Sequence, residues 1–72
     1  MVALPVLSGA DVIAALGRAG FTIAGQRGSH VKLRGPGNRT LIVPLHRELA
    51  AGTLRAIIRQ SGLSVAEFLD LL

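Results

Sequence analysis

The stretch that decides the fold is GSHVKLRGPGNRTLIVP, residues 28–44. Within it, residues 30–34 alternate polar and apolar side chains with a period of two, which is typical of a strand with one buried face. Residues 35–38 (GPGN) are a strong turn signal. The run of residues 40–43, rich in β-branched side chains, predicts a further strand that ends at Pro44. These patterns together predict two antiparallel strands joined by a turn.

A strand and a helix are predicted ahead of this stretch. Residues 21–24 alternate in the same way, so we expect them to form the first strand of a three-stranded meander, followed by a loop over residues 25–29. Farther towards the N-terminus, Ser8 and Asp11 have the spacing of a capping box, and apolar residues then recur at helical spacing. We therefore predict a first helix over residues 9–19.

Two helices are predicted after the strands. Thr53 is expected to cap a helix that ends at Gly62, and Ser64 with Glu67 forms a second capping box for a short last helix over residues 64–72. The order helix, three strands, helix, helix predicts an α+β fold. In this fold a small antiparallel sheet has the helices packed on one face, and its other face stays open.

Length and composition restrict the partners. Seventy-two residues are expected to form one domain, residues 1–72, which is too small for a deep enclosed substrate pocket. A net charge of +4 and a pI near 11.6 favour a polyanionic partner, which includes RNA, DNA and an anionic membrane. No stretch approaches the roughly 18–20 apolar residues of a membrane span. The chain has no cysteine, which suits the reducing cytoplasm.

Positive charge is concentrated in the middle of the chain. Between residues 18 and 47 every charged side chain is basic, and all four acids lie outside this segment. Strand alternation predicts that Val31 and Leu33 face the helices, while His30, Lys32 and Arg34 share the open face. One imidazole is thereby aligned with two cations, which favours phosphate chemistry. The alternative is that the basic run is a solvated face and the histidine an ordinary surface residue.

His30 is the candidate catalytic residue for RNA cleavage. RNA carries its own nucleophile, the 2′-hydroxyl, so cleavage needs a base and cations that stabilise the phosphorane, but no metal. An imidazole, with an unperturbed pKa of about 6.5, suits the role of base. Gly28 allows close backbone approach, and Ser29 either contacts phosphate, orients the imidazole or serves only as a turn residue. The residues predicted to hold RNA are Arg27, Gly28, Ser29, Lys32, Arg34, Arg55 and Arg59.

Other kinds of site find less support. His30 and His46 lack nearby carboxylates or thiols, so we expect no metal and no other cofactor. A Ser-His-Asp arrangement would need the distant Asp11 or Asp70. His46 is left with two interpretations, a second acid or a structural loop residue. An aromatic content of 3% argues against base stacking as the means of recognition and favours contact through backbone and shape.

Several ordered segments resemble a known family over nearly the full length. They are LSG at 7–9, GF at 20–21, RGSH at 27–30, VPLHREL at 43–49 and GTLRAIIRQSGL at 52–63. In this order and spacing the chain resembles the HicA-type toxins, the mRNA interferases of HicA–HicB toxin–antitoxin modules. The resemblance implies a fold similar to double-stranded-RNA-binding domains and ribosome-independent cleavage of mRNA, with a catalytic histidine at the position of His30. It also implies a cognate HicB-type antitoxin that blocks the active surface.

Two other functions stay open on the residues alone. One is a non-catalytic RNA-binding module that uses the same basic surface. The other is a protein-interaction module, whose apolar surface and cations serve an acidic partner. The mean hydropathy of +0.54 fits a surface covered by a partner, and it fits equally a small domain that exposes much apolar area.

Overall fold

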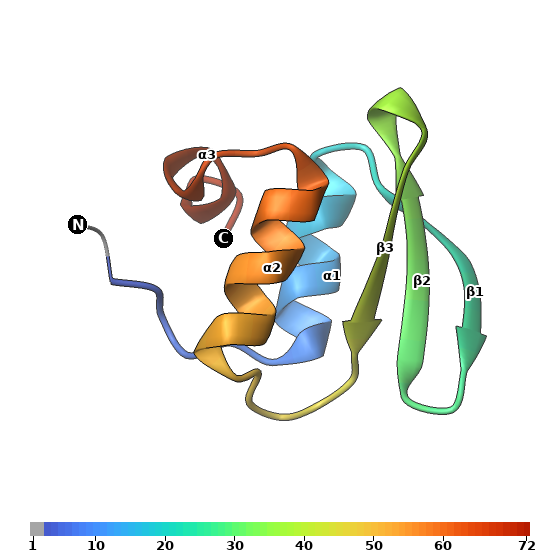
Figure 1. Ribbon diagram of the computed structural model, residues 1–72, viewed down its shortest axis with the longest axis horizontal. Coiled ribbons are helices and arrows are strands. Elements are labelled where there is room, and N and C mark those ends of the chain that lie inside the picture. The colour runs from blue at the N-terminus through green and yellow to red at the C-terminus, as the bar shows by residue number, and fades with distance from the viewer. Residues whose placement is uncertain (1–2) are drawn as a thin grey trace.

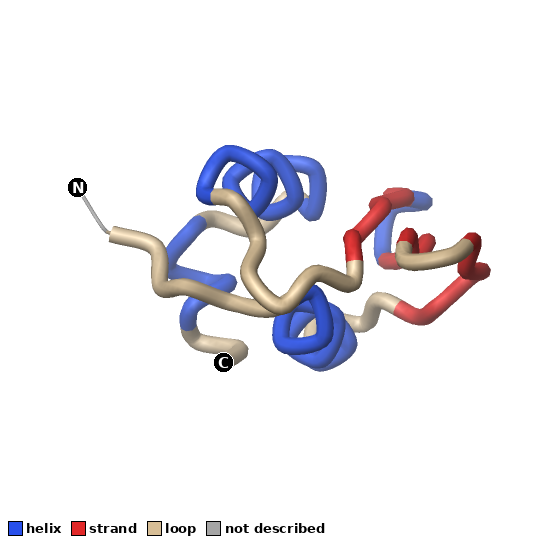
Figure 2. Tube along the Cα trace, turned by 90° about the horizontal axis from the view of Figure 1, so that it is seen from below, coloured by secondary structure: helices blue, strands red, loops and turns tan. Residues whose placement is uncertain are grey.

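The computed structural model describes residues 3–72, so residues 1 and 2 of the predicted domain lie outside the described residues. The strands form one antiparallel sheet in the order β1-β2-β3, with the helices packed against one side of it (Figures 1 and 2). The predicted α+β fold is confirmed. In chain order the elements are α1 (Gly9–Arg18), β1 (Thr22–Arg27), β2 (His30–Gly35), a 3-10 turn (Pro36–Asn38), β3 (Arg39–Pro44), α2 (Ala51–Ser61) and α3 (Val65–Leu69).

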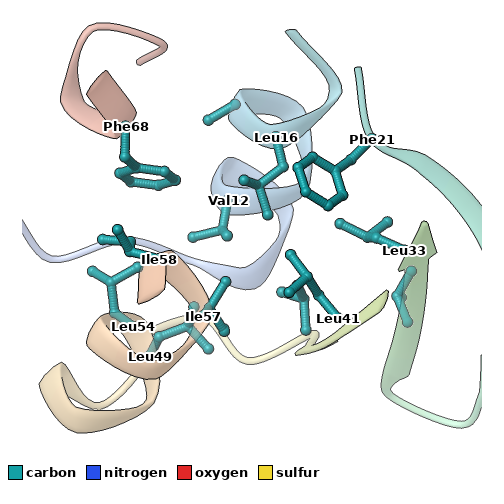
Figure 3. Packing of buried hydrophobic residues seen from close by; sticks show 13 residues of the cluster. Val12, Leu16, Phe21, Leu33, Leu41, Leu49, Leu54, Ile57, Ile58 and Phe68 are labelled. Atoms are coloured by element: carbon teal, nitrogen blue, oxygen red, sulfur yellow. The ribbon is translucent and has the colours of Figure 1, made fainter. Parts of the chain in front are cut away.

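The hydrophobic core lies between the helices and the sheet (Figure 3). Val12 and Leu16 of α1 are fully buried, because they recur at the spacing that places side chains on one face of a helix. Phe68 of α3 is also fully buried and closes the core at the end opposite Leu33 of β2. The last helix is therefore part of the domain's core.

Both predicted capping boxes are present. The backbone N–H of Asp11 donates to Ser8 Oγ over 3.0 Å, and the carboxylate of Asp11 accepts from the N–H of Ser8. Ser64 and Glu67 form the same reciprocal pair at the start of α3. Gly62 ends α2 with a φ of 81°, a conformation that glycine adopts without a steric penalty. The sequence signals for these helix ends are confirmed.

The prediction that Thr53 caps the second helix is wrong. Helix α2 already begins at Ala51, and the N–H of Leu54 donates to the carbonyl of Ala50 over 3.0 Å, so Thr53 lies within the first turn. Leu49 is buried, and its N–H donates to the carbonyl of Leu7. This anchoring fixes the chain just ahead of Ala50, so tertiary packing starts the helix where no side chain caps it.

The first strand also differs from the prediction. It covers Thr22–Arg27 instead of residues 21–24, and the expected loop over residues 25–29 shrinks to a turn of two residues. Every residue of β1 is exposed, so no alternation of burial marks its length. Phe21 lies ahead of the strand, buried against Gly35, where a β-carbon would enter its ring.

The last helix is shorter than the predicted residues 64–72. It ends at Leu69, and the N–H groups of Leu71 and Leu72 bond to carbonyls three residues earlier, which tightens the chain into turns. The guanidinium of Arg18 donates to the carbonyl of Leu71 over 2.8 Å. This long-range bond holds the C-terminal segment against α1. None of the helices in residues 3–72 is long and apolar enough to cross a membrane.

A close backbone contact brings the start of α1 to the end of β3. The N–H of Gly9 donates to the carbonyl of His46 over 2.9 Å. A β-carbon at Gly9 would collide with the carbonyl of Pro44, so only glycine fits there. In Figure 1 this end of the molecule also contains the β1–β2 turn and the start of α2.

Candidate functional site

The β1–β2 turn fixes the backbone that carries His30. Gly28 has a φ of 57° at the first central position of this two-residue turn, where a type II′ turn requires glycine. The side-chain amide of Gln26 donates to the carbonyl of Gly28 over 3.0 Å, and the N–H of Leu45 donates to the carbonyl of Ser29 over 2.6 Å. The turn is held by a residue of β1 and by the residue that follows β3, so His30 starts β2 from a defined position.

Strand register places His30 among cations on the side of the sheet away from the helices. His30 lies opposite Arg27 of β1 and Pro44 of β3, and Lys32 lies opposite Gly25 and Ile42. Directly opposite residues of an antiparallel sheet project to the same side. We call this side the outer face; its residues are Thr22, Gly25, Arg27, His30, Lys32, Arg34, Thr40, Ile42 and Pro44.

The predicted division of β2 is confirmed. Val31 and Leu33 are only 2% and 1% exposed because they pack into the core. The side chains between and beside them, His30, Lys32 and Arg34, are all exposed. The structure therefore brings together the imidazole and the two cations that the alternation assigned to one face.

A shallow groove of about 330 Å³ lies beside His30 on the outer face. Gly25 has no side chain, and a β-carbon built there would meet no atom within 4 Å, so the surface is hollow opposite Lys32. The groove is lined by Gly25, Gln26, Arg27, His30, Lys32 and Ile42. It is open to solvent and gives an extended ligand direct access to the imidazole.

The charge of the outer face has one sign. Its ionisable residues are Arg27, His30, Lys32 and Arg34, and no carboxylate is among its members. The acids lie elsewhere: Asp11 and Glu67 hold helix starts, Glu48 is in the loop after β3, and Asp70 follows α3. A phosphate-bearing ligand is therefore attracted to this face without a competing internal ion pair.

Two arginines of the basic segment, Arg18 and Arg39, bind backbone carbonyls and do not belong to the outer face. Arg39 donates to the carbonyl of Gln60 over 3.3 Å, and its guanidinium lies so close to Gly62 that a β-carbon there would collide with it. Arg18 binds the carbonyl of Leu71. Arginines near the last carbonyls of a helix stabilise that helix end. Sequence reasoning missed this division, because charge counts do not show which guanidinium folds back onto a carbonyl.

Arg55 and Arg59 do not join the His30 groove. Both are exposed on α2, where they line a separate groove of about 390 Å³. The other lining residues are Ile58, Leu63, Ser64 and Val65, so no residue of the sheet contributes to it. Any contribution of these two arginines to RNA binding would thus come from a second surface.

His46 lies in the loop just beyond β3. Its carbonyl accepts the N–H of Gly9, and the residue is two positions past Pro44, the partner of His30. Its imidazole is exposed. The backbone bond does not depend on the side chain, so it gives the imidazole no structural role of its own.

The chain matches a known protein family over most of its length. The family model described as HicA toxin of bacterial toxin-antitoxin matches residues 9–63. This match includes α1, all three strands and α2. No curated protein shows significant similarity to the chain.

Proposed function

Because this chain belongs to the HicA toxin family of bacterial toxin–antitoxin systems, we propose that it is an endoribonuclease that cleaves mRNA on its outer face, with His30 as the catalytic residue. One observation carries this proposal: an exposed imidazole stands opposite Arg27 and beside Lys32 on a face without a carboxylate. This arrangement provides a proton acceptor and positive charge, the two requirements for cleavage by the RNA's own hydroxyl.

The reaction begins with transfer of a proton from the ribose 2′-hydroxyl to the neutral imidazole of His30. The 2′-oxygen then attacks the adjacent phosphorus, and the bond from phosphorus to the 5′-oxygen breaks. Water reaches this exposed face and protonates the leaving oxygen, and the imidazolium returns its proton to solvent. One product carries a 2′,3′-cyclic phosphate and the other a 5′-hydroxyl. The step is a transesterification, so no water molecule is added to the RNA.

The cations act on the negative charge of phosphate. Lys32 and Arg27 flank His30 on the outer face, and we assign them to the non-bridging oxygens, on which charge increases in the transition state. Arg34 lies farther along β2 and binds a neighbouring phosphate. Gly28 and Ser29 form the turn that precedes His30, and we assign the Ser29 hydroxyl to the scissile phosphate. Arg55 and Arg59 would hold a more distant part of the RNA.

Membership of this family implies that the toxin works with an antitoxin. We propose a HicB-type protein that covers the outer face and so blocks access to His30. Covering this face would also remove the exposed Ile42 from water. The antitoxin and mRNA would then compete for one surface.

Cleavage of a labelled mRNA in EDTA tests the proposal. Wild type, His30→Ala and His46→Ala are compared, with folding of each checked by circular dichroism. His46→Ala is the matched control, because His46 is the chain's other histidine and is also exposed. We expect His30→Ala to lower the cleavage rate by about 10²–10⁴-fold, the usual contribution of a general base. His46→Ala is expected to cleave as wild type does, because His46 is not an outer-face residue and does not line the groove beside His30.

Two outcomes would contradict the mechanism. Equal cleavage by wild type and His30→Ala would remove the imidazole from the reaction. Equal cleavage of a substrate with 2′-deoxyribose at the cut position would remove the 2′-hydroxyl as nucleophile. If no variant cleaves while all bind RNA, the protein is a non-catalytic RNA-binding module.

A further inference from the structure

Ile42 is a large apolar side chain exposed on a mostly polar surface. It is 48% exposed, and it is the one large aliphatic side chain among the outer-face residues defined above. Its position is central, opposite Lys32 and one row from His30. Single exposed apolar residues are common on protein surfaces, so what bears on function is that Ile42 lines the groove beside His30.

A β-bulge in β1 shapes the groove that Ile42 lines. The pairing shifts between Ile23 and Gly25, so Ala24 is the extra residue. With regular pairing from Ile23 onward, Ala24 would oppose Lys32, and Gln26 would oppose His30. The bulge instead places Gly25 opposite Lys32 and Arg27 opposite His30. One extra residue thus opens the hollow and adds a cation beside the imidazole, the kind of re-aiming for which bulges are used near functional sites.

We propose that this groove binds a nucleobase, that of the nucleotide that supplies the 2′-hydroxyl. The base lies over Ile42 and the aliphatic stem of Lys32, which stands between Ile42 and the hollow at Gly25, while Arg27 and the Lys32 ammonium hold the scissile phosphate on its 3′ side. Neighbouring rows on one face are two residues apart, or about 6.6 Å along the strand at about 3.3 Å per residue. A base in the Ile42 row is therefore within the reach of one nucleotide from a phosphate at His30. This inference rests on the proposed function.

The chemistry of the groove defines its substrate class. An aliphatic floor covers the face of a base and leaves the base edges in solvent, so it accepts several bases with little discrimination. The base must leave a stacked helix to lie against the sheet, which favours single-stranded RNA. An apolar side chain of a protein partner would suit the same floor. The flanking cations and the adjacent imidazole favour RNA as the occupant.

The test compares two short RNA oligonucleotides centred on a mapped cleavage site. In one, the nucleotide before the scissile phosphate is abasic but keeps its ribose and its 2′-hydroxyl. The variants are Ile42→Ala, Gly25→Val, which fills the hollow, and Ile23→Ala as the matched control. Ile23 is 61% exposed on the same sheet, but it pairs with Leu33 and does not line the groove.

We expect wild type to lose about tenfold in kcat/KM on the abasic substrate, because an abasic nucleotide no longer covers the apolar side chain of Ile42. On the intact substrate, Ile42→Ala and Gly25→Val should each lower kcat/KM by about as much as removal of the base does in wild type. On the abasic substrate neither variant should lower kcat/KM much further, because the substitution and the missing base remove the same contact. Ile23→Ala should behave as wild type. Equal rates for wild type on both oligonucleotides would overturn the base site and leave the proposed nuclease in place.

Failure of the proposed function gives a different result. If wild type cleaves neither oligonucleotide, their binding is measured by fluorescence anisotropy instead. If wild type binds the intact oligonucleotide more tightly than the abasic one and Ile42→Ala abolishes this preference, the groove is a base site without catalysis. Equal binding of the two oligonucleotides by wild type would overturn the base site. Loss of antitoxin binding by Ile42→Ala, with RNA cleavage unchanged, would assign the groove to the protein partner and overturn the inference.

Discussion

The two faces of β2 differ in almost every property although they are built from alternate residues of one strand. Val31 and Leu33 are almost fully buried in the core, whereas His30, Lys32 and Arg34 are exposed on the outer face. Side chains that differ by one position in sequence therefore have different roles: those on one side stabilise the fold, and those on the other belong to the proposed RNA surface. The comparison teaches that a strand of six residues is enough to pack into a core and to present a candidate site.

The largest expected contrast is between neighbouring residues of this strand. We expect Leu33→Ala to lower the free energy of unfolding by about 2–5 kcal/mol, because it leaves a cavity in the core. Lys32→Ala should change it by no more than about 0.5 kcal/mol, since the side chain is exposed. Urea denaturation of both variants measures the difference. Similar losses in the two variants would break the division between the faces.

A smaller contrast separates two arginines of equal charge. Arg39→Ala should lower the free energy of unfolding by about 0.5–1 kcal/mol, because Arg39 donates to the carbonyl of Gln60 on an exposed surface. Arg34→Ala should leave stability unchanged. Instead it should reduce the slope of log binding constant against log salt concentration by about 0.7, the value for one contact to single-stranded nucleic acid.

Thermal unfolding and a salt titration of RNA binding, run on both variants, check this pair. An Arg39→Ala protein that keeps its stability and loses salt dependence would place Arg39 in the RNA surface. The distinction between structural and ligand-binding cations would then fail.

The smallest expected effect is on the pH dependence of stability, and it concerns Glu67, a carboxylate that lies away from the outer face. The N–H of Ser64 holds the pKa of Glu67 below its ordinary value of 4.5, with the Ser64 hydroxyl adding to the effect. A carboxyl whose pKa is lower in the folded protein stabilises it above the ordinary pKa, and this stabilisation is lost as pH falls through the lowered value. The melting temperature of wild type should therefore exceed that of Glu67→Gln at neutral pH, and the gap should close in acid.

Melting curves of both proteins from about pH 7 to about pH 2 measure this gap. A gap that stays constant over the range would show that the carboxylate charge of Glu67 adds nothing to the start of α3. The matched change Asp70→Asn is the control, because Asp70 follows the helix and takes no part in that capping box.

Local sequence patterns predicted the features that depend on a few neighbouring residues. The capping boxes at Ser8 and Ser64, the helix end at Gly62 and the alternation of β2 all rest on bonds or periodicities within one element. His30 could be selected in the same way, because alternation placed it with Lys32 and Arg34. Its catalytic role stays a prediction until cleavage is measured.

Features that depend on contacts between distant segments could not be predicted from local sequence patterns. The uncapped start of α2 follows from the anchoring of Leu49, and the length of β1 follows from pairing with β2 rather than from its own burial. The bulge at Ala24 decides that Gly25 and Arg27 join the outer face, and no local pattern marks it.

The sequence by itself therefore determined the order of the elements, most helix ends and the face on which His30 lies, because hydrogen bonds and side-chain periodicity over a few residues fix each of them. Only the tertiary structure decided the strand register, the groove beside Ile42, and the different positions of the arginines. These depend on which distant carbonyl or strand a group meets, and that is settled when the chain packs around its core.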